Sequence, residues 1–193
     1  MGCGKSSVGR SLSELLCCPF IDLDEAICTR AGKSIPEIFA SEGETEFRRL
    51  EAETLHSILT PSGAVRAEKQ SLPSQAMGPS LCGQRGSTVS PPLLYRRVIA
   101  LGGGTVMTPE CNEIVKEGSV CIYLKASTDT LVRHLETEAS GRPMLQGDSL
   151  RSRINELMSL RTATYEATAH ITIETDGKSI EAIAEEIINR LKD

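Results

Sequence analysis

The chain has 193 residues, a formal net charge of −5 and an isoelectric point of about 5.4. This length most simply makes one domain with a substantial core, and the acidic balance argues against a nucleic-acid or anionic-membrane surface. No apolar run approaches the roughly 18 residues that a membrane span needs. We therefore expect a single domain over residues 1–193 that works as a monomer, away from membranes and nucleic acids.

The number and spacing of the cysteines bear on metal binding and on the cellular compartment. The seven cysteines are scattered without a C-x-x-C pair, and the three histidines are scattered as well. This spacing does not predict a structural zinc site. No signal peptide is visible, and reduced thiols fit a cytoplasmic protein best.

The first motif is MGCGKSS, from Met1 to Ser7. Gly4, Lys5 and Ser6 match the end of the phosphate-binding pattern G-x-x-x-x-G-K-[ST], in which backbone N–H groups and a lysine hold phosphates and a hydroxyl binds Mg²⁺. From Lys5 to Cys17 the apolar residues fall at helical spacing, so a helix N-terminus would face the phosphates. Alone, the motif leaves a second reading open, a glycine-rich tail before an ordinary helix.

The beginning of this pattern is missing. Its first glycine would fall two positions before Met1, and the apolar strand that normally leads into such a loop is not in the sequence. We expect Met1 to be an internal methionine of an ordinary phosphate loop.

Strands and helices alternate along the rest of the chain. The predicted strands are 19–24, 97–101, 119–124 and 170–175; the predicted helices are 25–31, 35–43, 44–58, 108–118, 150–167 and two that begin at Ser127 and Ser179. Ser34 to Glu37 forms a capping box for the second of these helices. This alternation predicts an α/β fold with a doubly wound parallel sheet, whose ligands lie beyond the carboxyl ends of the strands.

Residues 60–96 do not fit the alternation. They are rich in Ser, Pro, Gly and Gln and have no periodicity. A structureless stretch of this length is uncommon inside a compact domain. We predict a disordered surface insert, and an artefact of sequence assembly stays open as the alternative.

Two acidic residues follow the first predicted strand. Asp22 and Asp24 are two apart in FIDLD, so on a strand both side chains would leave the same face. At a carboxyl end they could reach Mg²⁺ and a substrate hydroxyl together. A solvated turn is the alternative.

Arginines and glycines complete the candidate site. Arg48 and Glu51 in FRRLE share a helix face, which suits an arginine that forks onto a substrate carboxylate; a surface ion pair is the alternative. The triplet Gly102–Gly104 follows a strand, where backbone N–H groups can approach a ligand. The segment 140–148 carries Arg142 and suits a lid over transferring phosphate, or else an exposed loop. Arg161 follows on the long helix.

The motifs GCGKSS, FIDLD, FRRLE, LGGGT, GRPML and LRTATY, in this order, resemble the shikimate kinase family over nearly the whole chain outside 60–96. The resemblance implies a three-layer P-loop kinase fold, similar to nucleoside monophosphate kinases, with a five-stranded parallel sheet. The strand missing from this sequence would be the first and a central one. It also implies transfer of the ATP γ-phosphate to the 3-hydroxyl of shikimate, with Mg²⁺.

The same resemblance implies residue roles. Lys5 would contact the phosphates and act in catalysis, Ser6 would ligate Mg²⁺ with help from Asp22, and Asp24 would hold the attacking hydroxyl and accept its proton. The implied ATP-binding residues are Gly2, Cys3, Gly4, Lys5, Ser6, Ser7, Arg133 near the adenine and the catalytic lid residue Arg142. The implied shikimate-binding residues are Asp24, Arg48, Gly102, Gly103, Gly104 and Arg161.

Two alternatives stay open. One is another small-molecule kinase of this fold, acting on gluconate or a nucleoside monophosphate. The other is a non-catalytic remnant that binds nucleotide weakly or serves as an interaction surface. The F-R-x-x-E and triple-glycine motifs favour shikimate.

Overall fold

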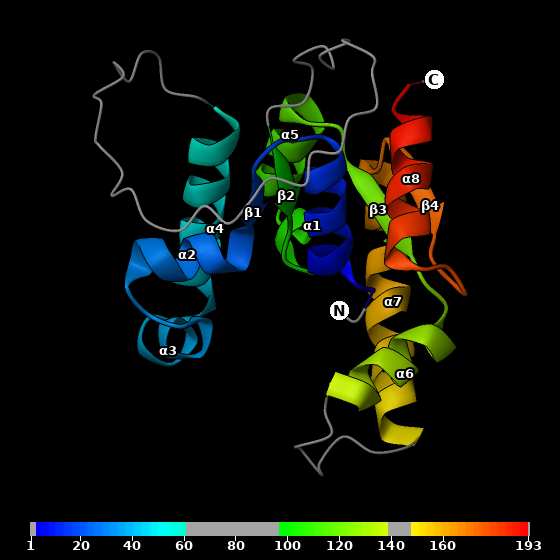
Figure 1. Ribbon diagram of the computed structural model, residues 1–193. Helices are drawn as coiled ribbons and strands as arrows, with labels where there is room; N and C mark the ends of the chain where they lie inside the picture. The colour runs from blue at the N-terminus through cyan, green and yellow to red at the C-terminus, as the bar shows by residue number, and fades with distance from the viewer. Residues whose placement is uncertain (1–2, 61–96, 139–147, 193) are drawn as a thin grey trace, which may run out of the picture.

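The computed structural model describes residues 3–60, 97–138 and 148–192 (Figure 1). The first stretch contains α1 (Lys5–Leu15), β1 (Phe20–Asp22), α2 (Leu23–Ala31), α3 (Ile35–Ser41) and α4 (Gly43–Leu59). The others contain β2 (Val98–Ala100), a 3₁₀ turn η1 (Thr105–Met107), α5 (Pro109–Gly118), β3 (Ile122–Lys125), α6 (Thr128–Glu138), α7 (Asp148–Thr168), β4 (Ile171–Glu174) and α8 (Ile180–Arg190). The predicted order of strands and helices is confirmed, with ends that shift by a few residues. The insert predicted over 60–96 lies outside the described residues except for its first position.

Local hydrogen bonds explain several helix ends. The Glu37 carboxylate accepts from the Ser34 N–H at 2.8 Å, which is one of the two bonds of the predicted capping box, and it also accepts from the Ser34 hydroxyl at 2.6 Å. The Ser179 hydroxyl accepts from the N–H of Ala182 and begins α8. Gly32 ends α2 with a φ of 65°, a left-handed conformation that glycine adopts without strain.

One local prediction is wrong. Asp22 is the last residue of β1, but Asp24 lies in the first turn of α2 and not on the strand. The Asp22 carboxylate accepts from the Asp24 N–H at 3.1 Å, so Asp22 acts as the N-cap that begins a helix where the sequence pattern predicted continued strand. The two carboxylates are brought together by a helix cap and not by strand alternation.

The four strands form two parallel pairs. In the first, Phe20 lies opposite Val98 and Asp22 opposite Ala100; in the second, Ile122 lies opposite Ile171. The predicted parallel α/β arrangement is confirmed. Within the described part of the chain no strand joins β2 to β3, so the sheet is divided at this point.

Apolar residues bury the helices against these strands. The α1 residues Val8 and Leu12 pack with Ile183 and Ile187 of α8 against β4. A second cluster joins α2, α3, α4 and α5; its members include Leu23, Ile27, Ile38, Leu55 and Val115. In Figure 1, α1 lies beside α8, while α2, α3 and α4 form a separate group at the other end of the molecule. None of the described helices is long and apolar enough to cross a lipid bilayer.

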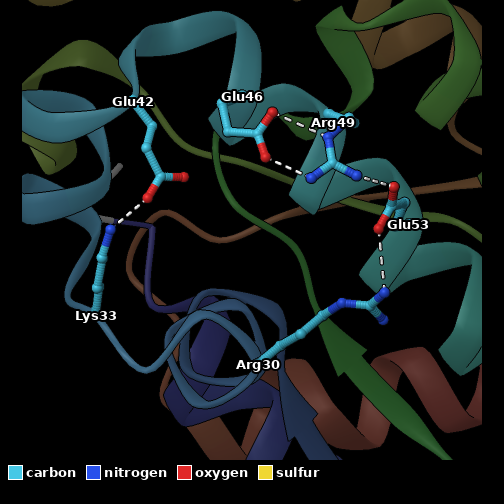
Figure 2. A network of polar contacts seen from close by, with 6 residues as sticks. All are labelled: Arg30, Lys33, Glu42, Glu46, Arg49 and Glu53. Atoms are coloured by element: carbon cyan, nitrogen blue, oxygen red, sulfur yellow. Dashed lines mark hydrogen bonds and ion pairs between the residues drawn. The ribbon is translucent and has the colours of Figure 1, made fainter.

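Charged side chains form a network of polar contacts on the surface of α2, α3 and α4 (Figure 2). Arg49 on α4 pairs with Glu46 and Glu53 of the same helix, and Glu53 also accepts from Arg30 of α2 at 3.1 Å. Lys33, which precedes α3, pairs with Glu42, which lies between α3 and α4. Exposed pairs of this kind stabilise a fold by about 1 kcal/mol or less each. They connect α2 and α4 on the surface, while the apolar cluster beneath holds these helices in place.

Candidate active site

The N-terminus of α1 lies beside the carboxyl end of β1. Gly4 precedes the helix with a φ of 73°, and its carbonyl accepts from the Val8 N–H at 2.9 Å. The Ser6 hydroxyl donates to Asp22 Oδ2 at 2.7 Å, which joins the helix start to the strand end. The Lys5 ammonium lies 4.0 Å from Cys3 Sγ. Free backbone N–H groups, a lysine and a hydroxyl at a helix start can hold a phosphate. Gly2 lies outside the described residues, and Ser7 is exposed.

Asp24 is half-buried among charged groups. Burial raises the pKa of the Asp24 carboxyl most, the nearby Asp22 and Glu51 carboxylates raise it further, and Lys5 lowers it. These four residues therefore share one electrostatic environment, although they come from α1, β1, α2 and α4. A carboxylate whose pKa is raised accepts a proton more readily than an ordinary aspartate does.

Glu51 is buried and fully engaged. Its side chain is 1% exposed and accepts from Arg48 Nη1 at 2.8 Å and from the Thr105 hydroxyl at 2.7 Å. The Arg48 side chain remains 29% exposed and pairs with Glu44 at 3.2 Å. Glu51 thus orients the Arg48 guanidinium. Part of this guanidinium still reaches solvent, where it could bind an anion.

The three consecutive glycines after β2 meet the other candidate residues. A Cβ on Gly102 would lie 2.9 Å from Asp24 Oδ1, and a Cβ on Gly104 would lie 3.1 Å from both Arg48 Nη atoms. The Gly103 carbonyl accepts from Arg161 Nη1 at 3.3 Å. Asp24, Arg48 and Arg161 therefore all touch one short backbone segment at the carboxyl end of β2.

Arg133 has a different neighbourhood. It lies on α6 and donates to the Thr130 hydroxyl at 3.2 Å. Hydrogen bonds from Thr130 and Ser127 lower the pKa of Asp176, and Arg133 adds a smaller effect in the same direction. These contacts place Arg133 near the loop that follows β4, and none of them reaches the glycine segment. Arg142 lies outside the described residues, as does the lid segment predicted over 140–148 apart from its last residue.

Two further residues belong to this site and were not predicted from the sequence. The Tyr165 hydroxyl donates to the Gly103 carbonyl, the group that Arg161 also contacts. Thr105 directly follows the glycine triplet, is fully buried and contacts Glu51. A signal was present for Tyr165, because residues four apart share a helix face and Arg161 had been singled out. For Thr105 the only signal was its position next to the glycines.

The parallel strands, the Gly-Lys-Ser helix start and the acidic and basic groups beyond the strand ends define a class of protein. They are the features of a P-loop kinase of the three-layer α/β type. Comparisons with known proteins identify the family within this class. The family model described as "Shikimate kinase" matches residues 1–68 and 92–192. The unmatched residues between these ranges fall inside the stretch that we predicted as an insert.

Curated relatives and solved structures agree with that match. The chain is 33% identical to the shikimate kinase of Thioalkalivibrio sulfidiphilus, over 97% of this chain and 80% of that protein. It is 34% identical to the shikimate kinase of Dictyoglomus turgidum, over 100% of this chain and 94% of that protein. The structure of shikimate kinase from Acinetobacter baumannii in complex with shikimate superposes with a TM-score of 0.73 at 26% identity, over 100% of this chain and 88% of that one. The chain belongs to the shikimate kinase family, and the resemblance predicted from its motifs is confirmed.

Proposed function

We propose that this chain transfers the γ-phosphate of ATP to the 3-hydroxyl of shikimate. The observation that carries the proposal is the convergence of Asp24, Arg48 and Arg161 on Gly102–Gly104. A small carboxylated alcohol needs cations for its carboxylate and an acceptor for its hydroxyl proton, and these three side chains supply both. Membership of the shikimate kinase family supports the choice of substrate.

The substrate carboxylate would bind to the two arginines. Arg48 is held by Glu51 with part of its guanidinium exposed, and Arg161 approaches the same glycine segment from α7. Two guanidinium groups fix both the position and the orientation of a carboxylate, because each can donate in a planar fork. Gly102–Gly104 would line this pocket, since a Cβ there would meet the binding side chains.

Asp24 would orient the attacking hydroxyl and accept its proton. Its raised pKa suits this task, because the carboxylate binds the released proton more tightly than an exposed aspartate would. Lys5 and the N-terminus of α1 would hold the phosphates of ATP, so that Asp24 would lie between these phosphates and the two arginines. Cys3, Gly4 and Ser7 would contribute to the same phosphate loop.

The residues present fit a magnesium ion. The described residues contain no group of three or more His, Cys, Asp or Glu side chains that could hold a metal. Magnesium does not need one, because it is commonly bound through one or two protein oxygens together with phosphates and waters. The Ser6 hydroxyl and the Asp22 carboxylate, 2.7 Å apart, provide such oxygens. The ion would neutralise charge on the phosphates of ATP.

The remaining roles are proposals of the same kind. Arg142 would bring positive charge to the transferred phosphate, and Arg133 would lie near the adenine. We also propose that the protein acts as a monomer in the cytoplasm. The free state of Cys3, Cys17, Cys18, Cys28, Cys111 and Cys121, the cysteines within the described residues, agrees with a reducing compartment.

A coupled assay of ADP release tests the proposal. ATP and Mg²⁺ are supplied with shikimate, with gluconate, with a nucleoside monophosphate, or with no acceptor. We expect rapid ADP release with shikimate and only background release in the other three reactions. Release with gluconate or the nucleotide instead would reassign the substrate, and background release throughout would leave a non-catalytic nucleotide-binding protein.

A further inference from the structure

Thr105 is a buried polar residue that joins the end of the glycine segment to α4. It is 0% exposed and begins η1 directly after Gly104. Its backbone N–H donates to the Gly102 carbonyl at 3.2 Å, and its own carbonyl accepts from the Thr108 N–H at 3.3 Å. Because both backbone groups are bonded, the side chain has a fixed direction. Its hydroxyl donates to Glu51 Oε1 at 2.7 Å.

The two carboxylate oxygens of Glu51 have different partners. Oε1 accepts from the Thr105 hydroxyl, and Oε2 accepts from Arg48 Nη1 at 2.8 Å. A carboxylate often binds a guanidinium with both of its oxygens, in two parallel hydrogen bonds. In this site the Thr105 hydroxyl occupies one of the oxygens. The printed contact between Glu51 and Arg48 therefore joins one oxygen to one nitrogen.

The second terminal nitrogen of Arg48 faces outward. Arg48 Nη2 pairs with Glu44 Oε1 at 3.2 Å, and the Glu44 side chain is 69% exposed. Exposed ion pairs of this kind are weak, so the carboxylate of a ligand can replace Glu44 at small cost. A Cβ on Gly104 would lie 3.1 Å from both Nη atoms, which places this end of the guanidinium beside the glycine segment.

We propose that Thr105 is a positioning residue that keeps Arg48 Nη2 available to the carboxylate of the substrate. Thr105 acts through Glu51 and does not itself touch the substrate. A buried carboxylate oxygen without a donor is costly. Without the Thr105 hydroxyl, Glu51 would therefore bind Arg48 with both oxygens and withdraw Nη2 from the ligand. The identity of the ligand rests on the function proposed above, whereas the effect on Arg48 does not.

Substitutions of Thr105 test this role by steady-state kinetics. Thr105→Val keeps the volume of the side chain and removes the hydroxyl. We expect it to raise the KM for shikimate about fivefold or more, the effect of one ordinary hydrogen bond, with kcat and the KM for ATP near the wild-type values. Thr105→Ser keeps the hydroxyl and should restore the wild-type KM. Thr105→Ala lacks the hydroxyl without burying a second methyl group, and it replaces the valine variant if that protein does not fold.

Thr54→Val is the matched control for the loss of a buried threonine hydroxyl. Thr54 lies on α4 with Arg48 and Glu51, and it is 3% exposed. Its hydroxyl has no hydrogen-bond partner among the described residues. The kinetic constants of Thr54→Val should equal those of the wild type. An unchanged KM for shikimate in Thr105→Val, an equal rise in Thr105→Ser, or an equal rise in Thr54→Val would overturn the proposal.

Chemical modification of arginine gives a readout that needs no kinase activity. Phenylglyoxal reacts with guanidinium groups, and mass spectrometry maps the modified residues. We expect Thr105→Val to slow the modification of Arg48 about fivefold or more, because Glu51 then holds both of its terminal nitrogens. Arg49, the exposed neighbour on α4, is the internal reference and should react at the wild-type rate.

The two readouts separate this proposal from the kinase proposal. Equal modification of Arg48 in the wild type and in Thr105→Val would overturn the role of Thr105, even in a protein that phosphorylates shikimate. A wild-type protein that does not phosphorylate shikimate would overturn the kinase proposal, and the modification rates would then decide the role of Thr105 alone.

Discussion

Among the individual residues of the candidate site, Asp24 has the most unusual electrostatic environment. Its burial, together with the Asp22 and Glu51 carboxylates, raises its pKa above the ordinary aspartate value of 3.8. The folded protein therefore binds a proton at Asp24 more tightly than the unfolded chain does. In the window between the ordinary value and the raised one, stability falls as the pH rises. Ionised Asp24, the form needed to accept a proton, is the form that the fold disfavours.

This environment gives opposite predictions for activity and stability. Asp24→Asn should lower kcat by about 10²–10⁴, the usual contribution of a general base. It should also raise the melting temperature at neutral pH, because the disfavoured charge is gone, and the gain should shrink below the pKa of Asp24. Asp176→Asn is the control, with an expected change in melting temperature of opposite sign. Hydrogen bonds from Thr130 and Ser127 lower the Asp176 pKa, so the loss of this carboxylate should lower the melting temperature at neutral pH. An Asp24→Asn protein that is less stable at neutral pH, or that keeps its turnover, would contradict this assignment.

The glycine segment allows the two roles of the site to be separated. A methyl group on Gly102 would lie 2.9 Å from Asp24 Oδ1, and one on Gly104 would lie 3.1 Å from the Arg48 guanidinium. We expect Gly102→Ala to lower kcat and Gly104→Ala to raise the KM for shikimate, each by about tenfold or more, because small displacements of reacting groups are costly. Steady-state kinetics measures both.

Gly118→Ala is the matched control for this pair. Its added Cβ would lie 3.6 Å from the Leu59 side chain, an ordinary contact, and Gly118 is the last residue of α5, outside the glycine segment. Kinetic constants of Gly118→Ala should equal those of the wild type. If Gly102→Ala and Gly104→Ala affected the same constant to the same degree, the proposed division of roles would be wrong.

At the scale of the helices, α4 carries both Arg48, the proposed substrate-binding arginine, and residues of the charged network in Figure 2. Its position depends on the apolar face, because Leu55 is fully buried whereas Arg49 remains 54% exposed. We expect Leu55→Ala to lower the free energy of unfolding by about 2–5 kcal/mol and Arg49→Ala to lower it by less than about 1 kcal/mol. Urea unfolding at two salt concentrations measures both. Comparable losses would mean that the surface charges, and not the core, fix this helix.

How far the sequence predicts these elements depends on where each signal lies. Helix α3 is marked by a local capping box and α4 by its periodic apolar face, so both could be predicted from neighbouring residues. The FIDLD segment carries two signals at once, and the N-cap function of Asp22 overrides the strand pattern at Asp24. The burial of Glu51 and its bond to Thr105 join residues 54 apart in sequence, so no local pattern reveals them. In the sequence, an arginine and a glutamate three residues apart have the same spacing whether they form a surface ion pair or part of a binding site.

The whole molecule brings residues from α1, β1, α2, α4 and α7 to the carboxyl end of β2. The Gly-Lys-Ser helix start and the two arginines proposed to bind substrate lie on different segments. The packing of the strand pairs with α1, α4 and α7 brings them together. The sequence predicted this convergence from the order of its motifs and the rule that ligands bind beyond parallel strand ends.

The most direct test of the account compares two neighbouring arginines of α4. Arg48 contacts Glu51 and Gly104 at the candidate site, whereas Arg49 pairs with Glu46 and Glu53 on the surface. A hydrogen bond to a charged group contributes about 1.5–3 kcal/mol, so Arg48→Ala should raise the KM for shikimate about tenfold or more. The KM for ATP should stay near the wild-type value, and Arg49→Ala should change neither constant. Equal increases in both KM values for Arg48→Ala, or the same effect from Arg49→Ala, would contradict a shikimate site built around Arg48.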